Sequence, residues 1–120
     1  MAQFDVPRNT GKQKEAIPYV VIVQSSLFDS YRRRVVVPLV RRSNLATSSA
    51  IIDIPLNPVF MIDGVEVLLH PLEIVSISSE QLGDKVTSLA EEGDRITAAL
   101  DELLTRAWAE ESRDQRSLTP

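Results

Sequence analysis

The chain has no cysteine, one histidine and one tryptophan among its 120 residues. Without cysteine there is no disulfide framework and no thiolate chemistry, so a reducing cytoplasm is the simplest location to expect. No apolar run approaches the roughly 18 residues that a membrane-spanning helix needs. The N-terminus also lacks the charged-then-apolar pattern of a signal peptide. We therefore expect a single-domain cytoplasmic protein with no membrane partner.

Motifs of common catalytic and cofactor sites are also missing. The sequence contains no glycine-rich phosphate loop, no zinc-ligand spacing and no nucleophile elbow. His70 precedes a proline and has no nucleophile or orienting partner nearby in the sequence, so a structural role competes with acid–base chemistry. We predict no catalytic residue, no metal and no cofactor, and a protein that is not an enzyme.

Charge is divided unevenly along the chain. The net charge is -4, but residues 1–45 contain 8 Lys or Arg against 3 Asp or Glu, whereas residues 46–120 contain 5 against 14. A nucleic-acid binder that is basic throughout is not expected. The basic N-terminal half is suited to an acidic partner, or to the acidic half of a second copy.

Two hairpins are predicted. Residues 19–40 contain two β-branched runs on either side of a polar turn at 25–31, which is typical of an antiparallel pair. Pro38 interrupts the second run and predicts a bulge, a bend or an edge position, because proline cannot donate a ladder hydrogen bond. The second hairpin, residues 59–69, turns at Asp63-Gly64, a pair that tolerates the positive φ angles of a type I′ turn.

Further short strands are expected at residues 3–6 and 73–77, which makes about five strands in a compact barrel or sandwich. After Ser78 the period changes, and Ser79 is a candidate helix N-cap before a short helix or turn. A longer helix follows, with apolar residues at three- and four-residue steps: Ile96, Leu100, Leu103, Leu104, Ala107 and Trp108. We predict a domain over residues 1–108 and a polar tail without ordered structure over 109–120.

Two features allow a functional and a structural interpretation. Arginines cluster at residues 32–34 and 41–42, either as charges that protect a strand edge from aggregation or as a site for an acidic or phosphorylated partner. On the partner interpretation, the candidate binding residues are Arg32, Arg34, Arg41 and Arg42. Trp108 either anchors the last helix on the sheet or forms an interface hot spot.

Residues 19–40 resemble the hairpin of the CcdB family of bacterial toxins. The similarity lies in V-x-V-Q-S-x-L-hydrophobic-D, a polar turn, and an Arg-hydrophobic-Val-Ile-Pro-Leu strand. The residues here are Val21, Val23, Gln24, Ser25, Leu27, Phe28, Asp29, Arg34, Val35, Val36, Val37, Pro38 and Leu39. Weaker similarity covers Gln3-Phe4 and residues 58–64, 73–76 and 94–104, so the resemblance extends over roughly residues 2 to 107.

The resemblance implies a mainly β fold with a C-terminal helix, a small SH3-like β-barrel that forms a symmetric homodimer. It implies the toxin of a type II toxin–antitoxin module, which traps the cleaved DNA complex of gyrase through the gyrase A subunit. A CcdA-like antitoxin would neutralise the toxin, and the candidate antitoxin-binding residues are Arg32, Arg34, Arg41 and Arg42. Both would take part in transcriptional repression, with operator DNA contacted only through the antitoxin.

The family's poisoning surface corresponds to the end of the last helix, so the candidate gyrase-binding residues are Leu104, Thr105, Arg106, Ala107 and Trp108. Family toxins end in an aromatic residue or Thr followed by Gly-Ile. This chain has Thr105-Arg106-Ala107 or Trp108-Ala109-Glu110 there, depending on the alignment, and continues further. Two alternatives therefore stay open: an mRNA-cleaving toxin of the MazF/Kid type, or a CcdB-like homologue that binds antitoxin without poisoning gyrase.

Overall fold

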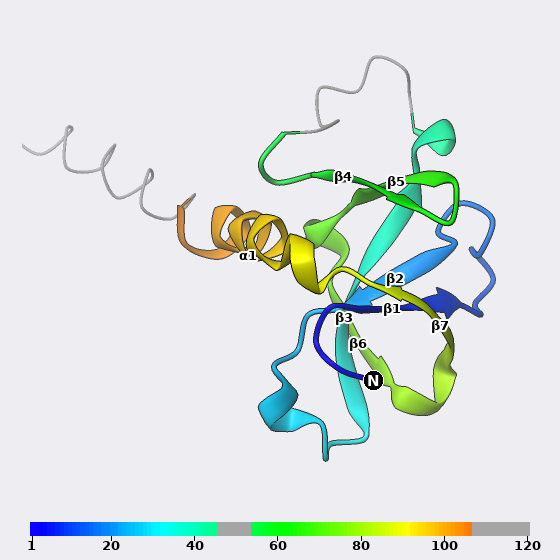
Figure 1. Ribbon diagram of the computed structural model, residues 1–120, viewed down its shortest axis with the longest axis vertical. Coiled ribbons are helices and arrows are strands. Elements are labelled where there is room, and N and C mark those ends of the chain that lie inside the picture. Colours follow the sequence, from blue (N-terminus) through cyan, green and yellow to red (C-terminus); the bar gives the residue numbers. More distant parts are fainter. Residues whose placement is uncertain (46–53, 107–120) are drawn as a thin grey trace, which may run out of the picture.

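The computed structural model describes residues 1–45 and 54–106, and consists of a curled antiparallel sheet with one C-terminal α-helix (Figure 1). Strand order is β4-β5-β3-β2-β1-β7, and β6 pairs with β3 beside this path. The elements are β1 (Asp5–Asn9), β2 (Tyr19–Ile22), β3 (Arg33–Arg41), β4 (Val59–Ile62), β5 (Val65–Leu69), β6 (Val75–Ser78), β7 (Leu82–Ser88) and α1 (Gly93–Asp101). The mainly β fold with a C-terminal helix predicted from sequence is confirmed.

The β2–β3 hairpin is the centre of the sheet, as predicted. Val21 pairs with Val37, and both side chains are fully buried in the main core, which also contains Ile96 of α1. The alternate residues Val20, Ile22 and Val36 form a second core cluster. Because both faces of this strand pair are covered, its valine and isoleucine runs are uninterrupted rather than alternating with polar residues.

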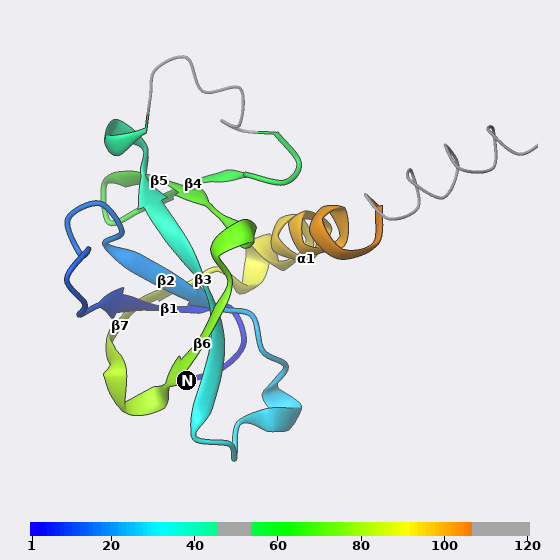
Figure 2. The same cartoon turned by 180° about the vertical axis from the view of Figure 1, so that it is seen from behind.

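Pro38 does not produce the predicted bulge or edge. It keeps regular register opposite Val20, inside a strand that has neighbours on both sides. On the side of β3 away from β2, β6 pairs up to Val36 and β5 begins pairing at Leu39 (Figure 2). The carbonyl of Pro38 accepts the His70 N–H at 3.1 Å. The nitrogen of Pro38 lies between the last residue of β3 that pairs with β6 and the first that pairs with β5. A missing donor therefore costs little at this position.

The β4–β5 hairpin is confirmed together with its turn chemistry. Asp63 has φ 50° and Gly64 has φ 77°, so both central residues are in the left-handed region that a type I′ turn requires. Ile62 and Val65 flank the turn as the last pair of the ladder.

The short helix or turn predicted after Ser79 is present as a turn, but its N-cap is Ser78 and not Ser79, and the strand that follows was not predicted. One 3-10 turn, Ser79–Gln81, leads into β7, which pairs with β1. Gly83 permits this pairing, because a Cβ atom there would lie 2.8 Å from the carbonyl oxygen of Arg8. The first strand is also shifted from the predicted 3–6 to Asp5–Asn9, with Phe4 at φ 70° just before it.

Helix α1 packs one side against the sheet and its far end points away from it (Figures 1 and 2). Ile96 and Ala99 are fully buried, and the ring of Phe4 packs against Gly93 at the start of the helix. The last turn, Glu102–Arg106, is π-helical. The tail predicted at 109–120 lies outside the described residues. Within the described ranges, no helix is long and apolar enough to cross a membrane.

Candidate functional site

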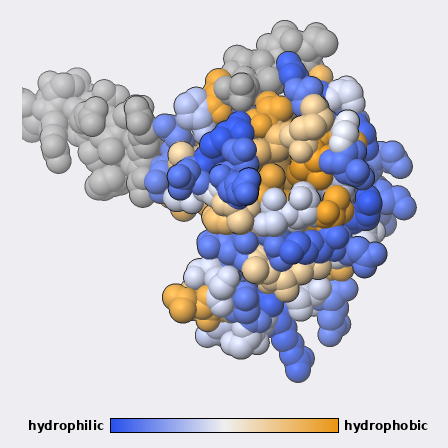
Figure 3. All heavy atoms as spheres, viewed as in Figure 1, coloured by the Kyte–Doolittle hydropathy of each residue, from blue (hydrophilic) through white to orange (hydrophobic). Residues whose placement is uncertain are grey.

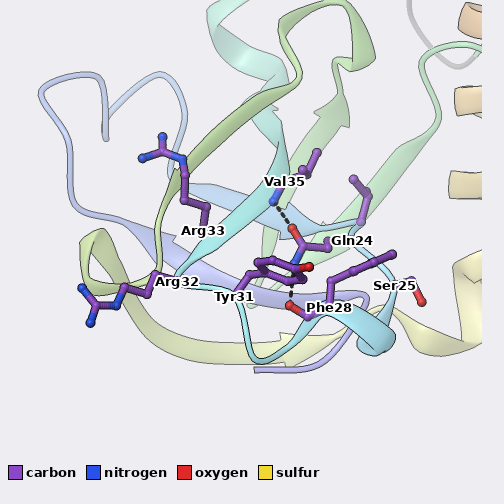
Figure 4. A pocket seen from close by; sticks show the side chains of 8 residues that line it. Gln24, Ser25, Phe28, Tyr31, Arg32, Arg33 and Val35 are labelled. Atoms are coloured by element: carbon purple, nitrogen blue, oxygen red, sulfur yellow. Dashed lines mark hydrogen bonds between the residues drawn. The ribbon is translucent and has the colours of Figure 1, made fainter.

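An apolar groove of about 500 Å³ opens beside the loop that connects β2 to β3 (Figure 4). Its lining residues come from the end of β2, this loop and the start of β3: Val23, Gln24, Ser25, Phe28, Tyr31, Arg32, Arg33 and Val35. The loop and β3 segments thus provide carbon-rich walls, with the charges of two arginines at the rim. Among these lining residues there is no Asp or Glu.

Buried Arg34 fixes the shape of the loop. Its side chain donates hydrogen bonds to the carbonyl oxygens of Asp29 at 2.7 Å, of Arg33 at 3.1 Å and of Tyr31. A charged donor makes stronger hydrogen bonds than a neutral one, so three carbonyls that the turn leaves unpaired are satisfied together. Arg34 therefore acts inside the loop and not on the surface of the groove.

Gln24 ties the same loop to the strand from the other side. Its Nε2 donates to the carbonyl of Phe28 at 3.0 Å, and its Oε1 accepts the Val35 N–H at 3.1 Å (Figure 4). The Ser25 hydroxyl accepts the Leu27 N–H at 3.2 Å. These side-chain contacts take the place of ladder hydrogen bonds and hold the loop in one conformation.

The rigid loop presents apolar side chains to solvent. Leu27 is 86% exposed, Phe28 47% and Tyr31 63%. The Phe28 and Tyr31 rings lie 5.9 Å apart between centroids at 47°, a tilted aromatic pair. Figure 3 shows hydrophobic side chains at the outer edge of this loop, with hydrophilic residues around them. An ordered, exposed aromatic cluster is typical of a surface that binds a partner.

The four predicted antitoxin-binding arginines do not form one patch. Arg32 is exposed at the groove, whereas Arg41 and Arg42 lie at the opposite end of the nine-residue β3, roughly 30 Å away at the usual strand rise. Arg41 Nε donates to the Glu15 carbonyl at 3.0 Å, and Arg42 forms an ion pair with Glu66.

Three of the predicted gyrase-binding residues, Leu104, Thr105 and Arg106, lie at the end of the C-terminal helix. Leu104 is 67% exposed on the turn that follows α1, and the backbone of Thr105 and Arg106 continues that turn. Ala107 and Trp108 lie outside the described residues. The helix end thus presents an apolar side chain where the sequence predicts a partner surface.

His70 stands apart from the groove. Its Nδ1 is buried and has no hydrogen-bond partner among the described residues. Across residues 1–45 and 54–106, no group of three or more His, Cys, Asp or Glu side chains is arranged to hold a metal ion.

Sequence reasoning placed a turn at residues 25–31 but missed the groove beside it. The available signal was three apolar residues, Leu27, Phe28 and Tyr31, inside a segment classed as polar. Turns usually carry polar residues, so apolar side chains there need either a core or a partner to cover them.

Comparison with protein families matches residues 3–105 to a family described as CcdB protein. The match covers the whole sheet, the groove and helix α1. Among curated proteins, no sequence matches the chain at a significant level.

Proposed function

This chain belongs to the CcdB family, whose members are toxins of toxin–antitoxin systems, and we propose that it traps the DNA gyrase–DNA cleavage complex through the gyrase A subunit. The observation that carries this proposal is the family match over residues 3–105, which includes the helix that leads to the candidate gyrase surface. The toxin acts in the cytoplasm by binding, without breaking a bond itself.

The gyrase contact is placed on Leu104, Thr105, Arg106, Ala107 and Trp108. Exposed Leu104 supports this placement, because Ile96 and Ala99 earlier in the helix are fully buried, whereas Leu104 on the turn that follows α1 is 67% exposed. Trp108 is the proposed anchor, since large aromatic residues supply much of the binding energy of interfaces. Arg106 adds a charged contact.

A CcdA-like antitoxin neutralises the toxin through an acidic segment that folds on binding. Arg41 and Arg42 provide one basic surface for it and Arg32 provides another, at the two ends of β3. Arg34 contributes indirectly, by holding the loop that carries Arg32. The functional unit is a homodimer, and operator DNA is contacted through the antitoxin.

The test is growth arrest after induction, in cells with normal gyrase and in cells with a resistant gyrase A subunit. Arrest in the first strain and growth in the second supports gyrase poisoning. Equal arrest in both contradicts it and favours an RNA-cleaving toxin of the MazF/Kid type, which a cleavage assay on cellular mRNA would then detect. Normal growth in both strains favours a homologue that only binds antitoxin.

A further inference from the structure

We propose that the groove between the β2–β3 loop and β3 binds one large apolar side chain of an acidic peptide segment, with Phe28 and Tyr31 as its aromatic wall and Arg32 as its charged contact. The inference rests on the proposed function only in identifying this peptide as part of the antitoxin. It adds a binding site distinct from the Arg41–Arg42 surface, at the other end of β3.

Shape and chemistry of the walls indicate an apolar occupant. The volume of about 500 Å³ lies within the range of roughly 300–1,000 Å³ that is usual for small-ligand pockets. Val23 and Val35 form the floor and the exposed Phe28–Tyr31 pair forms one wall. A single Leu, Phe or Trp side chain from another protein would remove these apolar surfaces from water, which is favourable.

Charges around the groove indicate an acidic occupant. Arg32 is exposed and its side chain has no hydrogen bond or ion pair to another described residue. Arg33 is held against β6, where it donates to the Ser76 hydroxyl at 2.9 Å and to the Ser76 carbonyl at 2.6 Å. With no carboxylate among the lining residues, the guanidinium of Arg32 is available to a carboxylate of the peptide.

The loop is ordered before the peptide arrives. Arg34 and Gln24 together fix the backbone between Phe28 and Val35 through hydrogen bonds to main-chain groups, which leave the Phe28 and Tyr31 rings and the Arg32 guanidinium without a hydrogen-bond partner among the described residues. A site that is already ordered loses little conformational entropy on binding, so its contacts contribute more of their energy to affinity. This distinguishes the groove from an accidental apolar depression in a mobile loop.

A second copy of the chain is a poorer occupant. In a contact with the groove on the two-fold axis, the groove faces itself, which would bring Arg32 and Arg33 of both copies together without acidic groups from the groove to compensate. An acidic segment with one large apolar side chain meets both requirements of the site, because the apolar side chain contacts the apolar wall and a carboxylate contacts the positive rim.

The experiment is fluorescence anisotropy with the full chain and labelled synthetic peptides of twelve residues. The panel has one central Trp, Phe or Leu flanked by glutamates. Two matched panels replace the glutamates by lysines or the central residue by serine. Saturable binding of an acidic-apolar peptide, at least about tenfold tighter than both matched peptides, is expected. Equal binding of the three panels, or none, overturns the proposal.

Variants assign the site. Tyr31→Ser and Arg32→Glu should each weaken the best peptide about tenfold or more, as substitutions in hot spots do. Lys14→Glu repeats the charge change at an exposed residue, and Met61→Ser removes a 65% exposed apolar side chain elsewhere, so both should leave the affinity within about twofold. Equal effects of Arg32→Glu and Lys14→Glu would contradict a specific site.

Two further readouts separate the possibilities. If Tyr31→Ser dissociates a dimer in sedimentation, a second copy occupies the groove and the proposal is wrong. Growth arrest is scored independently of peptide binding. Peptide binding without gyrase-dependent arrest supports the peptide site in the groove and contradicts gyrase poisoning. Arrest without peptide binding contradicts only the peptide site.

Discussion

Arg34 is only 7% exposed, and its guanidinium donates a 2.7 Å hydrogen bond to the main-chain carbonyl of Asp29, five residues earlier. The arginine triplet is therefore divided between different tasks. Arg34 organises the loop from inside, Arg33 attaches β3 to β6, and Arg32 faces solvent. A cluster that resembles a uniform basic patch in the sequence holds two structural charges and one charge available to a partner.

Replacing Arg34 by Met should lower the free energy of unfolding by about 1–3 kcal/mol, because loop carbonyls lose their donors. Arg32→Met removes the same charge from an exposed side chain and should change stability by less than about 0.5 kcal/mol. Urea unfolding of both variants measures the difference. Equal losses would show that Arg34 does not hold the loop.

Gly83→Ala should destabilise the fold by about 1–3 kcal/mol. The new Cβ would lie 2.8 Å from the carbonyl oxygen of Arg8, so the β1–β7 pair would have to separate. Gly11→Ala is the control, since its Cβ would approach only the side-chain oxygen of Asn9, at 3.2 Å. If both variants unfold at the same urea concentration, the close β1–β7 approach at Gly83 is wrong.

Substitutions at the helix end should separate toxicity from stability. Leu104→Ser should change the free energy of unfolding by less than about 0.5 kcal/mol, because Leu104 is 67% exposed, yet reduce growth arrest. Trp108→Ala should likewise keep the melting temperature and abolish arrest. A stability loss of roughly 3–5 kcal/mol for Trp108→Ala would instead identify a buried tryptophan that anchors the fold.

Charge reversal of Arg41 and Arg42 to Glu should weaken antitoxin binding and flatten its dependence on salt, because screened attraction contributes less when fewer opposite charges meet. Glu66→Gln provides the opposite change. It removes the ion-pair partner of Arg42, so binding should become tighter at low salt. Calorimetric titration at two salt concentrations measures both effects, and unchanged affinity in the double variant would exclude this surface.

Sedimentation equilibrium at micromolar concentration should show a homodimer of the 13.4 kDa chain. The physical reason is the apolar surface that one copy leaves exposed, including Leu72 at 65% and Val75 at 46%, which a two-fold partner would cover. A monomer throughout this concentration range would contradict the prediction.

Local patterns determined much of this protein. The valine-rich runs around residues 25–31, the Asp63-Gly64 turn and the three- and four-residue spacing after Ile96 predicted the central hairpin, the second hairpin and the helix. Each of these elements forms from neighbours in the sequence, so periodicity and turn chemistry are sufficient to predict it. The family resemblance depended on the same residues, because it was strongest in the central hairpin.

Contacts between distant residues decided the rest. Strand β7 forms because β1, roughly 80 residues earlier, supplies its hydrogen-bond partners, and no local pattern near Gly83 contains that information. Pro38 is accommodated because two different strands follow one another along the same side of β3. The groove exists because buried Arg34 and Gln24 fold the β2–β3 loop so that Phe28 and Tyr31 stand beside Val23 and Val35, an arrangement of side chains that only tertiary structure determines.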